Sequence, residues 1–152
     1  MIDVKLDIKA IPVPLRYQPI YKIVMLLAVL RYGCAKPYAA TFLKLHLYMW
    51  ALRSNENQQI LTAIKTKTRD SIVPWVFEPA LDQVITLAVI NDFCSRTIRA
   101  ADLQIEIKEK GLEFLTKLEA LELFAEDIGR VKDIGVVPQS LIAAVNKKWE
   151  LY

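Results

Sequence analysis

Glycine is scarce in this chain of 152 residues, and its four glycines are scattered as Gly33, Gly111, Gly129 and Gly135. A phosphate-binding loop needs closely spaced glycines so that backbone N–H groups can turn toward the anion. No glycine here belongs to a Gly-x-x-x-x-Gly-Lys pattern. The sequence therefore predicts no nucleotide site. Because there is also no Gly/Ser linker and no internal repeat, we expect a single domain spanning residues 1–152.

Histidine and cysteine are nearly absent, since the chain has only His46, Cys34 and Cys94. Neither a Cys-x-x-Cys pair nor a histidine cluster occurs, which predicts no metal site. His46 has no carboxylate three or four residues away, so a structural role is favoured over acid–base catalysis. We expect both cysteines to be buried free thiols. We also expect no cofactor and no enzymatic activity.

Long apolar runs are missing as well. The longest covers residues 23–30, whereas a helix that spans a bilayer needs about 20 residues. Residues 1–17 mix charges with prolines, unlike a secretory signal. We therefore expect a cytoplasmic protein without a membrane partner. Apolar residues nevertheless make up 54% of the chain, above the ~45–50% of ordinary soluble domains. This surplus predicts apolar surface that covers something besides the chain's own core.

Helical periodicity predicts much of the fold. Residues 20–32 are apolar around the whole helical wheel, which indicates a buried helix with Gly33 as its left-handed cap. Residues 37–53 are expected to form a second helix. Asn55 and Gln58 have the spacing of a capping box, which predicts a third helix of about a dozen residues.

The helix expected over residues 37–53 has two apolar stripes. One is core-facing and holds Tyr38, Phe42, Leu45, Met49 and Leu52. The second must meet either another helix of this chain or a different chain, and aromatic residues are enriched at interfaces. We predict that a partner binds the second stripe together with two aromatic residues of the extended segment over residues 71–79. The predicted partner-binding residues are Leu43, Leu47, Trp50, Trp75 and Phe77.

A further helix is predicted over residues 79–91, whose apolar period is carried by Leu81, Val84, Ile85, Ala88 and Val89. The period then changes to two. Residues 103–107 alternate apolar and polar, and residues 93–98 supply a partner strand, which predicts a β-hairpin. A Leu-rich helix follows. A last helix is expected to begin at Pro138 and to bury Leu141, Val145 and Trp149. Residues 121–137 carry no clear pattern.

Helices followed by an amphipathic helix, a hairpin and another helix give the order of a winged-helix domain. We expect a mainly α (α+β) fold with a winged-helix-like core over residues 20–120, an N-terminal arm over 1–19 and a helical extension over 121–152. The stretch QIEIKEKGLEFLTKL resembles the last wing strand and following helix of many winged-helix regulators. A DNA-binding transcription regulator is therefore the alternative function. Its recognition element, residues 78–92, has three carboxylates and no Lys or Arg, which disfavours contact with phosphates.

Basic side chains lie elsewhere and could contact a nucleic-acid backbone. They are Lys65, Lys67, Arg69, Arg96 and Arg99. An ordinary solvated surface is the other interpretation of these charges, and we favour it. Residues 1–75 hold 11 basic against 4 acidic side chains, and residues 76–152 hold 9 against 13. Such a gradient can steer a charged partner toward the N-terminal half.

The block YKIVMLLAVLRYGCAKPYAATFLKLHLYMWALRSNENQ resembles the small middle component of bacterial ABC three-component systems, the group that contains Lamassu-type defence operons. The similarity covers residues 17–118. It implies a non-catalytic winged-helix subunit that binds an SMC-like ATPase or an effector nuclease, in defence against phage or plasmid DNA. Within such a complex, the basic side chains would add to a non-specific DNA contact.

Overall fold

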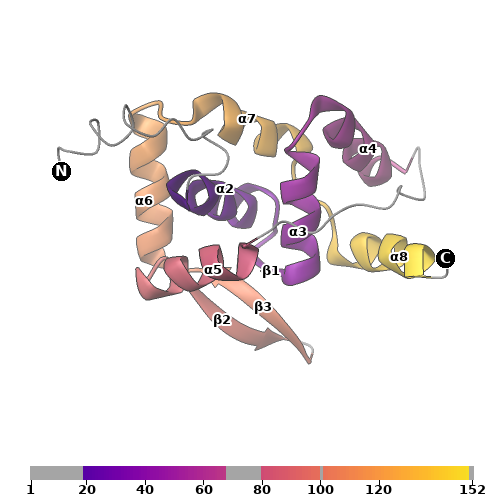
Figure 1. Cartoon of the computed structure of the whole chain (residues 1–152), viewed down its shortest axis with the longest axis horizontal. Coiled ribbons are helices and arrows are strands. Elements are labelled where there is room, and N and C mark those ends of the chain that lie inside the picture. The colour runs from indigo at the N-terminus through magenta and orange to yellow at the C-terminus, as the bar shows by residue number, and fades with distance from the viewer. Residues whose placement is uncertain (1–18, 68–79, 100, 151–152) are drawn as a thin grey trace.

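The computed structural model describes residues 19–67, 80–99 and 101–150 of the chain, with side chains up to residue 144. The helices are α2 (Pro19–Tyr32), α3 (Phe42–Ala51), α4 (Asn55–Lys65), α5 (Leu81–Ile90), α6 (Glu109–Ala120), α7 (Ala125–Ile134) and α8 (Gln139–Glu150). The strands are β1 (Ala39–Thr41), β2 (Cys94–Arg99) and β3 (Asp102–Ile107). Figure 1 shows a mainly helical fold with a small antiparallel sheet, which confirms the predicted α+β class.

Helix α2 lies at the centre of the molecule, and α3, α5, α6 and α7 pack around it (Figure 1). Every side chain from Ile23 to Leu30 is buried, as the sequence predicts. A helix that is apolar all round is stable only when other elements cover all of its faces. Much of the apolar surplus of the sequence is therefore used inside this chain.

Gly33 does not form the predicted left-handed cap, because among the described glycines only Gly135 has a positive φ, of +69°. Gly33 is needed for space instead. A Cβ atom at this position would lie 2.8 Å from the Val29 carbonyl oxygen and 2.9 Å from the ring of Tyr48. The missing side chain thus lets Tyr48 of α3 approach the end of α2.

The helix predicted over residues 37–53 begins only at Phe42. Thr41 caps it, since the Thr41 hydroxyl accepts a hydrogen bond from the Lys44 N–H at 3.3 Å. Residues 39–41 form strand β1 and pair with β3. The continuous helix was the wrong prediction because this strand is defined by a partner far away in the sequence.

Helices α4 and α5 begin close to their predicted starts. The cap of α4 is Ser54 rather than Asn55, and its hydroxyl accepts a hydrogen bond from the Asn57 N–H at 3.1 Å. Helix α5 begins two residues after Pro79, and Ala80 precedes it with a left-handed φ of 64°. Its buried side chains are Leu81, Val84, Ile85 and Ala88, which confirms the predicted amphipathic period.

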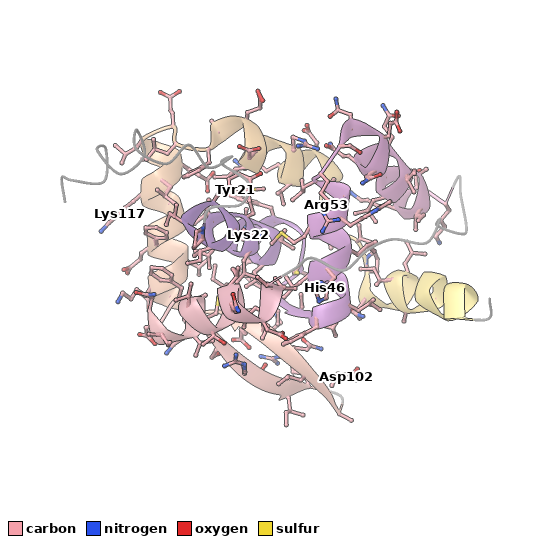
Figure 2. All side chains as sticks on the ribbon, viewed as in Figure 1. Tyr21, Lys22, His46, Arg53, Asp102 and Lys117 are labelled. Carbon is pink, nitrogen blue, oxygen red and sulfur yellow. The ribbon has the colours of Figure 1, made fainter. Side chains whose placement is uncertain are left out.

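Strands β2 and β3 form the predicted hairpin, and β1 adds to the other side of β3, so the sheet order is β1-β3-β2. All neighbours are antiparallel, with Cys94 opposite Ile107 and Arg99 opposite Asp102 at the two ends of the hairpin. The hairpin projects away from the helices (Figure 1). Figure 2 shows Asp102 at its far end.

Residues 121–137, for which the sequence shows no clear pattern, contain α7. Its buried side chains are Ile128, Val131 and Ile134. This part of the chain is helical, as expected for the extension, and it contributes side chains to the core.

Helix α8 begins one residue after Pro138, close to the prediction. Ile142 is buried, and Leu141 packs against the core while staying half-buried. The predicted burial of Val145 and Trp149 lies outside the described side chains.

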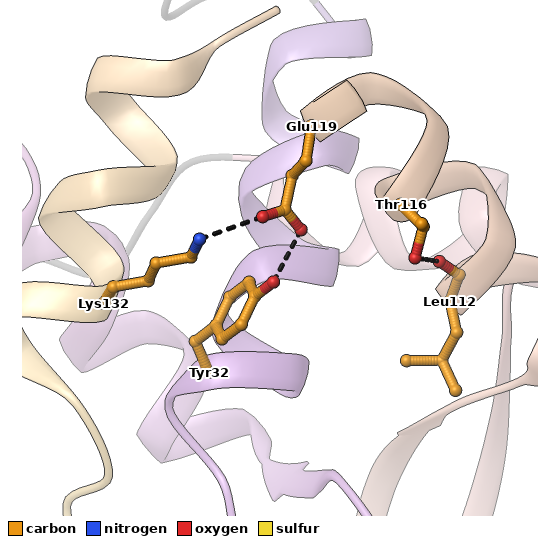
Figure 3. A network of polar contacts seen from close by, with 5 residues as sticks. All are labelled: Tyr32, Leu112, Thr116, Glu119 and Lys132. Atoms are coloured by element: carbon orange, nitrogen blue, oxygen red, sulfur yellow. Dashed lines mark hydrogen bonds and ion pairs between the residues drawn. The ribbon is translucent and has the colours of Figure 1, made fainter. Parts of the chain in front are cut away.

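A polar network joins three helices on the surface (Figure 3). Tyr32 of α2 donates a hydrogen bond to one Glu119 carboxylate oxygen at 2.6 Å, and Lys132 of α7 donates to the other at 2.9 Å. Glu119 belongs to α6, so α6 and α7 are linked to each other and to the end of α2. None of the helices in the described ranges combines the length and the hydropathy that crossing a bilayer requires.

Candidate interaction surface

The second stripe of α3 lies inside the chain. Leu47 is 3% exposed and Trp50 is 6% exposed, and both belong to the core cluster. Leu43 is half-buried against the same cluster. Helix α3 contacts α2, α4, α8 and the sheet, so the chain itself covers both stripes. The predicted partner surface at Leu47 and Trp50 is corrected accordingly, because these side chains are already packed.

The other two predicted partner-binding residues, Trp75 and Phe77, lie outside the described residues. Among the described residues, exposed large apolar side chains occur at positions other than the predicted ones. Four of them lie on α5 and on the hairpin that follows it: Leu87, Ile90, Ile98 and Leu103. We call these four residues the α5–hairpin face.

On α5, exposure follows from an excess of apolar residues over what the core-facing stripe needs. Leu87 and Ile90 lie off the buried period of the helix, and Ile90 is 73% exposed. They are three residues apart and therefore neighbours on the helix surface. The other exposed side chains of α5 include Asp82, Gln83 and Thr86. No lysine or arginine lies between residues 81 and 90.

On the hairpin, exposure follows from its length. Residues paired across two strands lie on the same face of a sheet. The inner face of the hairpin, which faces the helices, therefore carries Cys94 with Ile107 at the base and Ile98 with Leu103 near the tip. Cys94 and Ile107 are buried, whereas Ile98 is 76% exposed and Leu103 is 47% exposed. The apolar inner face of the hairpin thus continues beyond the helices that cover it.

Helix α5 and the hairpin are held together by specific contacts. Arg96 of β2 donates a hydrogen bond to the Thr86 hydroxyl at 3.1 Å. The N–H of Phe93 donates to the Ala88 carbonyl at 2.9 Å. Lys108, at the end of β3, forms an ion pair with Asp92. The two parts of the α5–hairpin face therefore belong to one local unit.

The predicted nucleic-acid residues are not brought together. Lys65 is the last residue of α4 and Lys67 follows the helix, and Lys65 donates to the Ile134 carbonyl at 2.7 Å. Arg96 and Arg99 lie on the hairpin, at another end of the molecule (Figure 1). Arg99 forms an ion pair with Glu106, which compensates its charge. Arg69 lies outside the described residues.

Buried titratable groups gather beside the end of α2. Lys44 is buried, and burial lowers the pKa of its amine. Burial also raises the pKa of the Cys34 thiol and of the Tyr48 hydroxyl. The Lys44 amine lies 6.0 Å from the centre of the Tyr48 ring. Since a protonated, inaccessible thiol is a poor nucleophile, this cluster is suited to packing.

The second thiol has the same character. Cys94 is buried, and burial raises its pKa to about 12. Both cysteines are free and buried, as predicted. In the ranges that the structure describes, no group of three or more His, Cys, Asp or Glu side chains is placed to hold a metal ion.

The exposed residues of the α5–hairpin face have a signal in the sequence. In residues 81–90, Leu87 and Ile90 fall outside the buried stripe, and Ile98 and Leu103 are apolar residues next to a predicted turn. An apolar residue that the local pattern does not bury is a candidate for contact with another molecule. This signal is weaker than the second apolar stripe of α3, which holds a tryptophan.

Comparison of the chain with protein-family models, curated proteins and solved structures finds no match in any of the three. Function must therefore be inferred from the geometry of the chain itself. The resemblance to the ABC three-component systems stays a prediction.

Proposed function

We propose that this chain is a non-catalytic winged-helix subunit that binds a larger protein through the α5–hairpin face, in the cytoplasm. The order α2, β1, α3, α4, α5, β2, β3 and the sheet order β1-β3-β2 support the winged-helix assignment. In a winged helix the second helix of a helix-turn-helix unit precedes the hairpin, as α5 does here.

The exposure of apolar side chains on two adjoining elements carries the proposal. Leu87 and Ile90 project from α5, and Ile98 and Leu103 project from the hairpin that is bonded to it. Single exposed apolar residues are ordinary, but several on one local unit are typical of a surface that another protein covers. A polar rim is present in Gln83 and Thr86, as interfaces commonly have.

The resemblance over residues 17–118 supplies the class of partner. We propose an SMC-like ATPase with a long coiled coil, acting together with an effector nuclease in defence against phage or plasmid DNA. This chain would contribute binding and positioning, while nucleotide hydrolysis and cleavage belong to the larger subunits. Lys67, which is exposed, is available for a non-specific DNA contact inside the complex.

A DNA-binding regulator is the competing function. It requires α5 to enter the major groove, where phosphates favour Lys and Arg and base edges favour Arg, Asn and Gln. The exposed side of α5 carries Gln83 but no Lys or Arg, and beside it are Asp82 and two large apolar side chains. The partner that fits this side best is therefore a protein.

Co-purification tests the proposal. The tagged full chain is expressed with the coiled-coil ATPase that we expect to be encoded beside it, and the two should elute as one complex at physiological salt. The chain alone should hydrolyse no ATP and should bind duplex DNA weakly, without sequence preference. A chain that elutes without the ATPase and binds one DNA sequence at nanomolar concentration would instead identify a regulator.

A further inference from the structure

The outer edge of β2 offers backbone groups that the hairpin does not use. The Lys108 N–H donates to the Phe93 carbonyl at 2.8 Å, so these two residues face each other across a hydrogen bond. In an antiparallel ladder, hydrogen-bonded and non-hydrogen-bonded pairs alternate. Cys94, Arg96 and Ile98 are therefore in non-hydrogen-bonded pairs with β3, and their N–H and C=O groups point away from it.

An independent contact supports this assignment. Ile107, which lies opposite Cys94, donates its N–H to the Tyr38 carbonyl at 3.2 Å on the far side of β3. Residues in a non-hydrogen-bonded pair do turn their backbone groups to the opposite neighbour. Within the described residues, β3 is the only strand that pairs with β2. No described residue therefore pairs with the N–H and C=O groups of Arg96 and Ile98, which form the outer edge of the sheet.

The two edges of this sheet differ in what they offer. β1 has three residues and runs directly into α3, whereas β2 has six residues and projects with the hairpin. An unpaired edge strand is a ready template for one more strand. β2 is consequently the edge at which an extended segment can be added.

Side chains on the inner face of β2 define which segment fits. Arg96 is exposed, and its guanidinium donates to the Thr86 hydroxyl, a neutral group. Among the described residues, no carboxylate forms an ion pair with Arg96. Ile98, two residues further on, is exposed and apolar. A charge on an edge strand repels purely apolar strands. It favours a strand that brings a carboxylate opposite Arg96 and an apolar side chain opposite Ile98.

We propose that the β2 edge accepts an extended, acidic and apolar segment of the partner protein as an additional antiparallel strand. In that orientation the segment reads apolar, any residue, acidic, with the apolar residue opposite Ile98 and the acidic residue opposite Arg96. Backbone hydrogen bonds supply affinity, and these two side chains supply selectivity. The proposal rests on the proposed function, because the added strand belongs to the same partner protein. It is the segment of that partner that binds at the hairpin.

A display library of peptides of about eight residues, roughly one strand in length, tests the binding mode without the ATPase. Selection on the full chain should enrich the pattern apolar, any residue, acidic. A synthetic peptide of the enriched sequence should then slow amide hydrogen exchange at Arg96 and Ile98. Enrichment of another composition, no enrichment, or protection elsewhere would overturn the proposal. Failure to co-purify with the ATPase would overturn the proposed function and leave this result standing.

Two substitutions separate backbone bonding from side-chain contact. Ile98→Pro removes an outward N–H that the hairpin does not use, and edge positions of this kind tolerate proline. Binding of the enriched peptide should be about tenfold weaker for Ile98→Pro than for Ile98→Ala, which keeps the N–H. Hydrogen exchange at Thr97 and Gln104, a hydrogen-bonded pair, checks that the hairpin stays formed.

Charge inversion provides a variant that keeps the backbone intact. For Arg96→Glu we expect loss of the acidic peptide and enrichment of peptides with a basic residue at the same position. Equal binding of the acidic peptide by Arg96→Glu and by the unmodified chain would contradict the proposed pairing.

Discussion

Tyr48 in the middle of α3 donates a hydrogen bond to the Gly135 carbonyl at 2.6 Å, which ties the core helix to the end of α7. The same hydroxyl accepts a hydrogen bond from the Val137 N–H at 3.2 Å and also contacts the Gly33 carbonyl. Tyr48 is fully buried. One phenol oxygen therefore satisfies backbone groups from two segments that are far apart in the sequence.

Replacing Tyr48 with Phe should lower the free energy of unfolding by about 1–3 kcal/mol, because buried backbone groups lose their partner. Denaturant unfolding of the full chain measures this. Tyr32→Phe is the matched control. Its hydroxyl bonds Glu119 at a half-buried site where water can replace the bond, so we expect a loss of only about 0.5–1 kcal/mol. Equal losses would show that Tyr48 has no special role.

Trp50→Ala should destabilise the isolated chain by about 3–5 kcal/mol, since removing a buried indole leaves a cavity. Thermal unfolding without any partner measures this effect. A Trp50→Ala variant as stable as the unmodified chain would contradict the placement of this side chain in the core and would favour a role at an interface.

Lys44→Met should raise the free energy of unfolding at neutral pH by about 1 kcal/mol, because burying an amine is costly when no carboxylate pairs with it, and none of the described residues offers one. Lys36, which is exposed, gives the control Lys36→Met, for which we expect a change within about 0.5 kcal/mol. A loss of stability for Lys44→Met would mean that contacts with Cys34 and Tyr48 outweigh the cost of burial.

Stability should fall at alkaline pH because of Cys94. Its pKa in the folded chain is about 12 against an ordinary value of 9.0, so the folded state keeps a proton that the unfolded state releases. This contribution is complete below pH 9.0 and is lost as the pH rises toward 12. Cys34 and Tyr48 act in the same direction. Lys44, with a lowered pKa, acts in the opposite one.

The measurement is the slope of the unfolding free energy between about pH 9 and pH 11. Cys94→Ala should make this slope less steep by about 1.4 kcal/mol per pH unit. Its stability at neutral pH is a separate matter, because the smaller side chain also leaves a cavity. An unchanged slope would place the ionisation that causes alkaline unfolding elsewhere.

Local patterns in the sequence sufficed for α2, α5 and the hairpin. Val84, Ile85 and Ala88 repeat at helical spacing, and Ile105 and Ile107 alternate with polar residues. Each of these patterns has a buried side that a single element defines by itself. The predicted boundaries were accordingly within about two residues of the observed ones.

Features that depend on distant partners were missed. Residues 39–41 are a strand only because β3 pairs with them. Helix α7 has apolar residues at helical spacing, but the residue before it is Phe124 in a left-handed conformation, and no Ser, Thr, Asp or Asn cap marks its start. Leu47 and Trp50 showed that α3 must be covered twice. The sequence did not say that the same chain does the covering.

The affinity of the full chain for the proposed coiled-coil ATPase tests the central claim most directly. Ile90→Asp and Ile98→Asp alter exposed side chains of the α5–hairpin face and should leave the thermal midpoint nearly unchanged. Each should weaken the complex at least about tenfold. Leu121→Asp, at a residue 67% exposed outside this face, is the control and should bind normally. Normal binding by folded Ile90→Asp and Ile98→Asp would contradict the claim.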